Sequence, residues 1–183
     1  MALRNWVGLA IIGTLLAADS LHAQQAGNTD RLEIRRNRVT GLASFVRAKD
    51  GGAIPVPAAA VAAAPGPDDF IRAHGPLFGV TDPVNQLTPD RVTGDDIGYT
   101  HTSFRQVHAG VPVIGGVLRI HQDKAGAFRS ANGDVFPIPA GLNVVPTLNA
   151  ADAVAAANGR LNLAAPTVEK NTLVIVDPGW YGD

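Results

Sequence analysis

The chain has 183 residues, no cysteine and a formal net charge of −1. This charge argues against a nucleic acid or an anionic membrane as partner, because both bind basic surfaces. The absence of cysteine excludes a disulfide framework and thiol catalysis. The length suits one domain or one and a half.

The N-terminus has the features of a secretory signal peptide over residues 1–23. Arg4 precedes an apolar run over residues 6–18, and the small residue Ala23 predicts cleavage between Ala23 and Gln24. The run is shorter than the ~20 residues that a membrane span needs; an uncleaved anchor is the alternative. With no cysteine present, bacterial export to the periplasm or the medium fits best, leaving no membrane attachment after leader removal.

Residues 24–66 are expected to hold N-terminal strands and a linker. Two strand-like runs lie within residues 31–49 on either side of Thr40-Gly41, with apolar positions at Leu32, Ile34, Leu42, Phe45 and Val46. An arginine cluster there suits a solvated edge strand or an acidic partner: Arg35, Arg36 and Arg38. Gly51 to Pro67 indicates a linker or loose surface loop, with a short helix conceivable over Ala58–Ala64.

From Pro67 the pattern predicts a helix. Asp68 and Asp69 suit its first turn, and apolar spacing continues through Phe70, Ile71, His74, Leu77 and Phe78. Gly75-Pro76 is expected to end the helix near His74 and to leave Leu77-Phe78 as a hydrophobic plug. Residues 81–96, rich in Pro, Asp and Gly, are expected to form a connection.

Residues 97–136 predict an antiparallel β-meander of three or four strands. Thr100 to His108 alternates with period two, Ala109-Gly110 turns the chain, and Val111 to Ile114 carries Pro112. Gly115-Gly116 permits a bulge before a strand over Val117–Gln122, and Asp123 to Gly126 forms a hairpin loop. Asn132-Gly133 is a strong two-residue hairpin signal.

After Pro146 a second helix and a last strand are expected. Asn149 suits the N-cap, Asp152 follows three residues later, and the helix continues through Ala153 to Leu161. Leu173 to Val176 then forms a strand that Asp177-Pro178-Gly179 ends. The fold class is therefore α+β: an antiparallel meander with one or two packed helices, followed by a helix-strand unit.

The residues themselves predict no active site. The chain has no His-Glu-x-x-His zinc motif, no Gly-x-Ser-x-Gly elbow and no glycine-rich phosphate loop. Asp95 and Asp96 sit in turn contexts. Zinc bound by His101, His108 and His121 is conceivable, but a separation of seven places His101 and His108 on opposite faces of a continuous strand. We expect no cofactor, no metal and structural roles for the histidines, including His74.

The order of motifs in the meander resembles the FTP domain, the N-terminal pro-domain of secreted fungalysin-like and thermolysin-like zinc metallopeptidases, over residues 68–183. The matching residues are His101, Phe104, Gln106, Gly110, Val111, Pro112, Val113, Gly115, Gly116, His121, Asn132 and Gly133. Ser103, His108 and Ile114 depart from the pattern, and Ser103 lacks the charge of the arginine usual in the family. The resemblance implies a pro-domain core over residues 67–145.

The same resemblance implies that residues 146–183 open a second pro-domain, PepSY-like and incomplete here. Family pro-domains act as intramolecular chaperones and inhibitors of their catalytic domain, so we expect such a domain as partner, in cis if the frame continues and otherwise in trans. Phe104, Val113, Ile114 and Phe136 are either contacts to that protease or core residues of the meander. The remaining alternatives are a stand-alone secreted inhibitor or chaperone, and an unrelated exported binding module.

Overall fold

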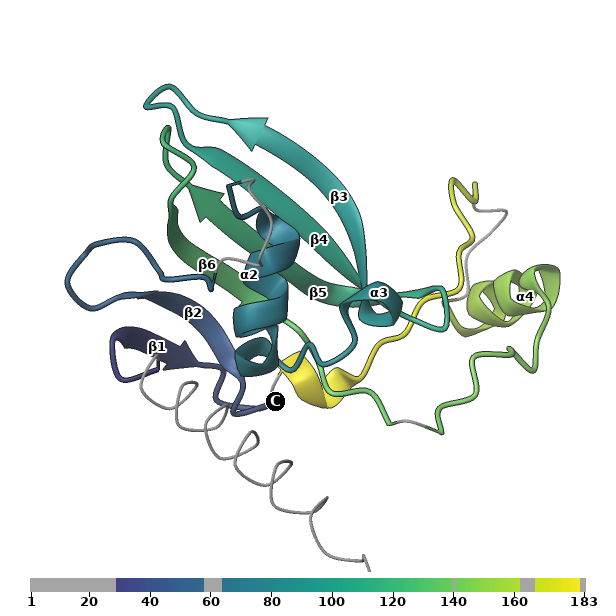
Figure 1. Ribbon diagram of the computed structural model, residues 1–183. Helices are drawn as coiled ribbons and strands as arrows, with labels where there is room; N and C mark the ends of the chain where they lie inside the picture. Colours follow the sequence, from purple (N-terminus) through teal and green to yellow (C-terminus); the bar gives the residue numbers. More distant parts are fainter. Residues whose placement is uncertain (1–28, 58–63, 140, 162–166, 182–183) are drawn as a thin grey trace, which may run out of the picture.

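A computed structural model describes residues 29–57, 64–139, 141–161 and 167–181 (Figure 1). Within these residues, six strands form one antiparallel sheet in the order β1-β2-β6-β5-β4-β3. The strands are β1 (Leu32–Arg36), β2 (Ala43–Ala48), β3 (Leu87–Gly94), β4 (Thr100–His108), β5 (Val111–Gln122) and β6 (Phe128–Asp134). The predicted leader and its cleavage site lie outside the described residues.

The predicted meander is confirmed as β4, β5 and β6. Ala109 and Gly110 both have positive φ, 48° and 79°, which is the pattern of a type I′ hairpin turn between β4 and β5. At the loop between β5 and β6, Asp123 accepts hydrogen bonds from the backbone of Ala125 and Ala127. Val111 to Gln122 is one continuous strand of 12 residues, with Gly115 at φ 76° in its middle.

Two expectations about the meander's surroundings are wrong. Residues 81–96 are not only a connection, because they contain the short helix α3 (Pro83–Gln86) and the edge strand β3. β3 gives no periodic apolar signal since only Leu87 is buried, and Pro89 is tolerated at a sheet edge.

Asn132-Gly133 is not a hairpin turn but lies inside β6, which pairs with both β2 and β5. Gly133 has φ 133°, and a Cβ there would lie 1.9 Å from the carbonyl oxygen of Val117. The glycine therefore serves a close approach of two strands rather than a turn.

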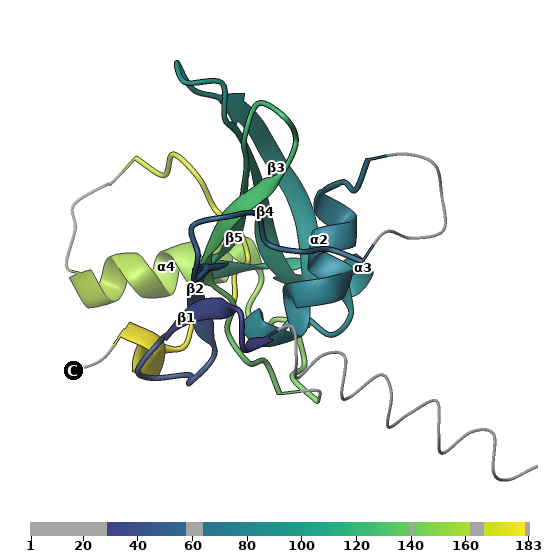
Figure 2. The same ribbon diagram turned by 60° about the vertical axis from the view of Figure 1, so that its left-hand side comes forward.

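Helix α2 (Pro67–His74) covers one face of the sheet, as predicted, and ends at Gly75. A 3₁₀ turn, η1 (Gly75–Phe78), follows and places Phe78 in the core as the expected plug. Phe70, Ile71 and Phe78 pack there with sheet residues, among them Leu118 and Ile120, which are fully buried. Figure 2 shows the sheet nearly edge-on, with α2 and α3 on the same side.

The N-terminal strands are confirmed, and they belong to the same sheet as the meander through the pairing of β2 with β6. The segment after Gly51 is not loose throughout, because Ile54 is anchored to the sheet. Ile54 is 2% exposed and donates its N–H to the carbonyl oxygen of Phe128. Residues 58–63, where a short helix was conceivable, lie outside the described part of the chain.

The C-terminal region is packed far less than the sheet. Helix α4 (Ala150–Leu161) begins at the predicted cap, where Asn149 Oδ1 accepts from the N–H of Asp152 at 2.9 Å, but it has no buried residue. Instead of a strand over residues 173–176, a single parallel bridge joins Ile175 to Val113. A 3₁₀ turn, η2 (Pro178–Tyr181), follows. Every helix of the described residues is too short or too polar to cross a bilayer.

Candidate functional site

The sheet face opposite α2 is lined by polar residues in two cross-strand rows, which we call the open face. Residues directly opposed in a sheet point to the same side. The histidine row consists of Glu33, Arg47, Ser130, His121, His101 and Thr93. The arginine row consists of Arg35, Phe45, Asn132, Arg119, Ser103 and Arg91. Both rows cross all six strands.

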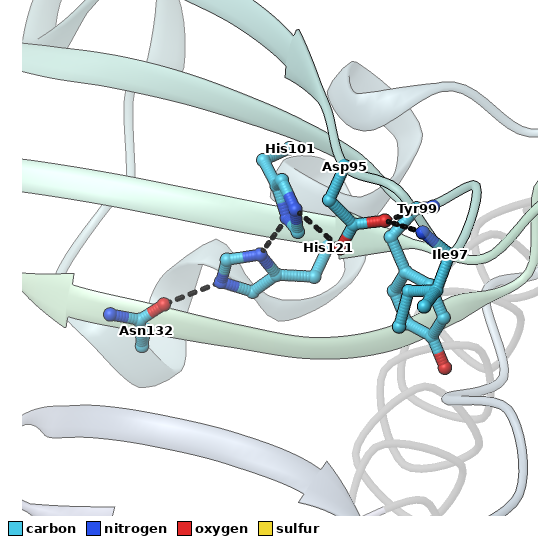
Figure 3. A network of polar contacts seen from close by, with 6 residues as sticks. All are labelled: Asp95, Ile97, Tyr99, His101, His121 and Asn132. Atoms are coloured by element: carbon cyan, nitrogen blue, oxygen red, sulfur yellow. Dashed lines mark hydrogen bonds and ion pairs between the residues drawn. The ribbon is translucent and has the colours of Figure 1, made fainter.

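A polar network on the open face, near the ends of β4 and β5 beside the β3–β4 connection, joins four segments (Figure 3). Nδ1 of His101 on β4 lies 2.6 Å from Nδ1 of His121 on β5. The other ring nitrogen of His101 lies 3.2 Å from Asp95 Oδ2, before β4. The other ring nitrogen of His121 lies 2.6 Å from Asn132 Oδ1 on β6. The network therefore ties three neighbouring strands and the β3–β4 connection together.

Asp95 is fixed by the backbone of its own turn. Its Oδ1 accepts the N–H of Tyr99 at 2.8 Å and that of Ile97 at 3.1 Å. These bonds, that of Tyr99 foremost, lower the pKa of Asp95, and His101 lowers it further. The turn context expected for this aspartate is correct, and its second oxygen remains available to His101.

Hydrogen-bond roles along the network follow from the ionised Asp95. A carboxylate only accepts, so Nε2 of His101 carries a hydrogen, and one of the two facing Nδ1 atoms carries another. With Asn132 Oδ1 toward His121, Nε2 of His121 donates to it; with the Asn132 amide reversed, that nitrogen accepts instead.

The arginine row carries positive charge without local neutralisation at two positions. Within the described residues, Arg47 and Arg35 pair with Glu33, and Arg105, further along β4, pairs with Asp90, whereas Arg91 and Arg119 form no ion pair. Ser103 lies between these two arginines and is 5% exposed. The guanidinium that the family pattern places at position 103 is thus absent, but arginines flank it on both sides.

Other motif residues point into the core and act together. Gln106 is 1% exposed, and its side-chain amide both donates to the carbonyl of Phe136, at 2.7 Å, and accepts its N–H, at 2.8 Å. A Cβ at Gly116 would lie 2.6 Å from the Gln106 side chain, so Gly116 provides the space for it. The Phe-x-Gln and Gly-Gly motifs therefore form one packing unit that fixes the chain after β6.

Burial decides which of the four apolar residues that could be either core residues or protease contacts belong to the core. Phe104, Val113 and Phe136 are each 5% exposed and belong to the interior, whereas Ile114 is 45% exposed. Among the remaining motif residues, Gly110 forms the turn, Val111 lines a groove, and the carbonyl of Pro112 accepts the N–H of Ile175.

The histidines do not converge on a metal position. The described residues contain no group of three or more potential ligands that could hold a metal ion. His101 and His121 face each other, but Asp95 contacts the far nitrogen of His101, so the donor atoms do not share a centre. His74, the last residue of α2, is buried, its Nε2 lies 2.9 Å from the carbonyl oxygen of Pro55, and burial lowers its pKa.

Sequence reasoning identified His101, His121 and Asn132 as motif residues but did not pair them, and it did not connect Asp95 to them. Their meeting depends on sheet register between residues up to 37 positions apart, counted from Asp95 to Asn132. The family order of motifs pointed to His101, His121 and Asn132, and the two histidines were also weighed as zinc ligands, but neither signal gave their contacts.

Comparison with known proteins supports the resemblance. Curated proteins contain no match to this chain. A family model described as the Fungalysin/Thermolysin Propeptide Motif, FTP, matches residues 85–135, a segment from α3 to the end of β6 that contains the whole polar network. FTP domains are non-catalytic propeptide domains of secreted proteases, so the match suggests the propeptide of a thermolysin-like protease. The sheet from β3 to β6 is therefore the part of this chain that matches the FTP model.

Proposed function

We propose that this chain is the pro-region of a secreted thermolysin-like zinc metallopeptidase and acts as chaperone and inhibitor of the catalytic domain. The observation that carries the proposal is the FTP match over residues 85–135. The chain's own residues support a binding role rather than catalysis, because the polar network is a set of mutual hydrogen bonds beside two arginines, Arg91 and Arg119, that form no ion pair within the described residues.

A folding template has to be folded before the protease domain that it helps to fold. The sheet and α2 share a continuous core, in which Val46, Phe70, Leu118 and Ile120 are fully buried. This part of the chain therefore presents a preformed surface. Binding to a preformed surface avoids the entropic cost of ordering both partners at once. Proteases that need such a template are kinetically rather than thermodynamically stable.

The open face is the surface that we assign to the protease. Arg91 and Arg119 are two strands apart in one row, which places them about 10 Å from each other at the usual strand spacing. Two guanidinium groups at that separation suit carboxylates on an acidic surface, because neither is neutralised within the described chain. Side chains that point into the core are assigned to stability instead.

The proposal is tested by refolding a denatured thermolysin-like catalytic domain with and without this chain in trans. We expect a higher yield of active protease when the chain is present, and a smaller gain with Arg119→Glu. Arg38→Glu is the matched control, because Arg38 is exposed in the β1–β2 turn and belongs to neither row of the open face. A yield that does not respond to the chain contradicts the proposed function, whereas equal effects of both variants contradict only the assignment of the open face.

A further inference from the structure

One edge of β5 is left without a strand neighbour from the meander. Along β5, pairing with β6 begins only at Val117, opposite Asp134. Gln106 then holds Phe136, and the chain after β6 leaves the sheet. Residues Pro112–Ile114, which we call the acceptor edge, therefore lie beyond the last residue of β5 that pairs with β6. On the other side Pro112 pairs with Val107 of β4, whereas Val113 and Ile114 fall in the irregularity of that pairing.

The C-terminal segment occupies this acceptor edge. Ile175 donates its N–H to the carbonyl of Pro112 at 2.8 Å, and its own carbonyl accepts the N–H of Ile114 at 2.9 Å. The two bonds straddle Val113, which is the parallel partner of Ile175. This is the hydrogen-bond pattern of one step of a parallel ladder, made by residues 62 positions apart.

The surroundings of the bridge are apolar. Val113 is 5% exposed, and its bridge partner Ile175 lines a groove of about 600 Å³ between residues 137–139 and 142–146 on one side and residues 173–178 on the other. Its lining includes Ile138, Val144, Val145 and Leu173. A peptide with an extended backbone can form main-chain hydrogen bonds with the acceptor edge. If its side chains are apolar and β-branched, it can also bury them in the groove.

We propose that the acceptor edge is a strand-binding site for an extended apolar peptide in parallel orientation, and that residues 173–176 are its ligand within this chain. The pairing covers an edge that would otherwise be open to other strands. It also ties the sparsely packed C-terminal region to the sheet, since α4 itself buries no residue.

The ligand needs an N–H at the position of Ile175, which gives a sharp test. Ile175→Pro removes the donor to Pro112, whereas Val174→Pro, the matched control, removes an N–H that is not part of this ladder. Amide hydrogen exchange of Ile114 reports the pairing, and that of Ile120 in the core reports the fold. We expect Ile175→Pro to accelerate exchange at Ile114 by about tenfold or more, with Ile120 unchanged and with no effect of Val174→Pro.

A peptide of residues 171–178 then tests the site in trans. It should restore the protection of Ile114 in the Ile175→Pro variant, and the same peptide with proline in place of Ile175 should not. Equal exchange at Ile114 in the wild type and in Ile175→Pro, or equal action of the two peptides, would overturn the proposal. Protection that rises with protein concentration would also overturn it, because a second copy would then be the ligand.

A crosslink tests the same register without proline. The chain has no cysteine, so Val113→Cys with Ile175→Cys introduces the only pair of thiols. Direct parallel partners lie within the Cα separation that a disulfide spans. Rapid disulfide formation in this variant, and slow formation for Val113→Cys with Leu173→Cys, is the expected result. Equal rates would place the segment elsewhere.

Discussion

Single residues decide how closely the strands of this sheet approach one another. Gly116 leaves room for Gln106, and Gln106 occupies both hydrogen-bonding groups of Phe136. Gly133 leaves room for the carbonyl of Val117. These motif glycines are therefore required by contact between backbones and side chains, and only one motif glycine, Gly110, forms the turn that the sequence predicted.

Substituting two glycines with positive φ, Gly126 and Gly133, distinguishes the cost of backbone strain from the cost of a steric clash. Gly126, at φ 81°, has open space around it, whereas a Cβ at Gly133 would meet β5. Gly126→Ala should cost about 1–2 kcal/mol of unfolding free energy through strain alone. Gly133→Ala should cost about 2 kcal/mol more, or prevent folding, because β5 has to move. Urea unfolding of both variants measures the difference, and equal costs would contradict the close approach.

His74 makes stability depend on pH in a defined direction. Burial lowers its pKa in the folded protein below the ordinary value of about 6.5. As the pH falls through 6.5, the unfolded chain binds a proton that the folded chain excludes, so stability decreases until the lowered pKa is reached. Urea unfolding at pH 7.5 and 5.5 should show a larger loss for the wild type than for His74→Gln. An equal loss would place the ring in water.

At the scale of elements, the register of β4 and β5 places the polar network. Next to the turn, His108 pairs with Val111, and continuing that register would pair His101 with Leu118. The irregularity between Arg105 and Val107 shifts the register by three residues and brings His121 opposite His101. An odd shift also exchanges the two faces of the strand.

This shift shows what the sequence could predict and what it could not. Period two in β4, the turn at Ala109-Gly110 and the helix from Pro67 follow from local pattern, and all three were predicted correctly. Gly115-Gly116 indicated a bulge but not its size. Since the size of the bulge sets the register beyond it, the pairing of His101 with His121 could not be predicted. β3 was missed because an exposed edge strand with Pro89 has no apolar alternation.

Substitutions in α4 should affect only the local stability of that helix, whereas substitutions in α2 should lower the stability of the whole fold. Asn149→Ala removes the cap of α4 and should weaken that helix by about 1 kcal/mol, seen as faster amide exchange over residues 153–156. Global unfolding should not change, because α4 has no buried residue. Ile71→Ala in α2 should instead lower the global unfolding free energy by about 2–5 kcal/mol. A global effect of Asn149→Ala would mean that α4 belongs to the core.

For the whole molecule, the contrast lies between a packed sheet and an exposed C-terminal region. The sheet and α2 hold the core, while the C-terminal region buries little. Val145, Leu148, Leu161 and Val176 are more than half exposed, as are four apolar residues in the turns and edge of the sheet region: Val39, Val84, Val92 and Ile97. Exposed apolar residues suit surfaces that bind another protein, which supports the proposal that residues 146–183 open a further, PepSY-like unit.

The central claim, that this chain binds a thermolysin-like catalytic domain, is tested most directly by calorimetric titration of one into the other. We expect saturable binding that weakens as salt is raised, because the open face contributes Arg91 and Arg119, which have no ion-pair partner in the part of the chain that the structure describes. Binding should be weaker for Arg91→Glu with Arg119→Glu than for Arg38→Glu. Heats no larger than those of dilution, with any thermolysin-like enzyme at low salt, would contradict the account.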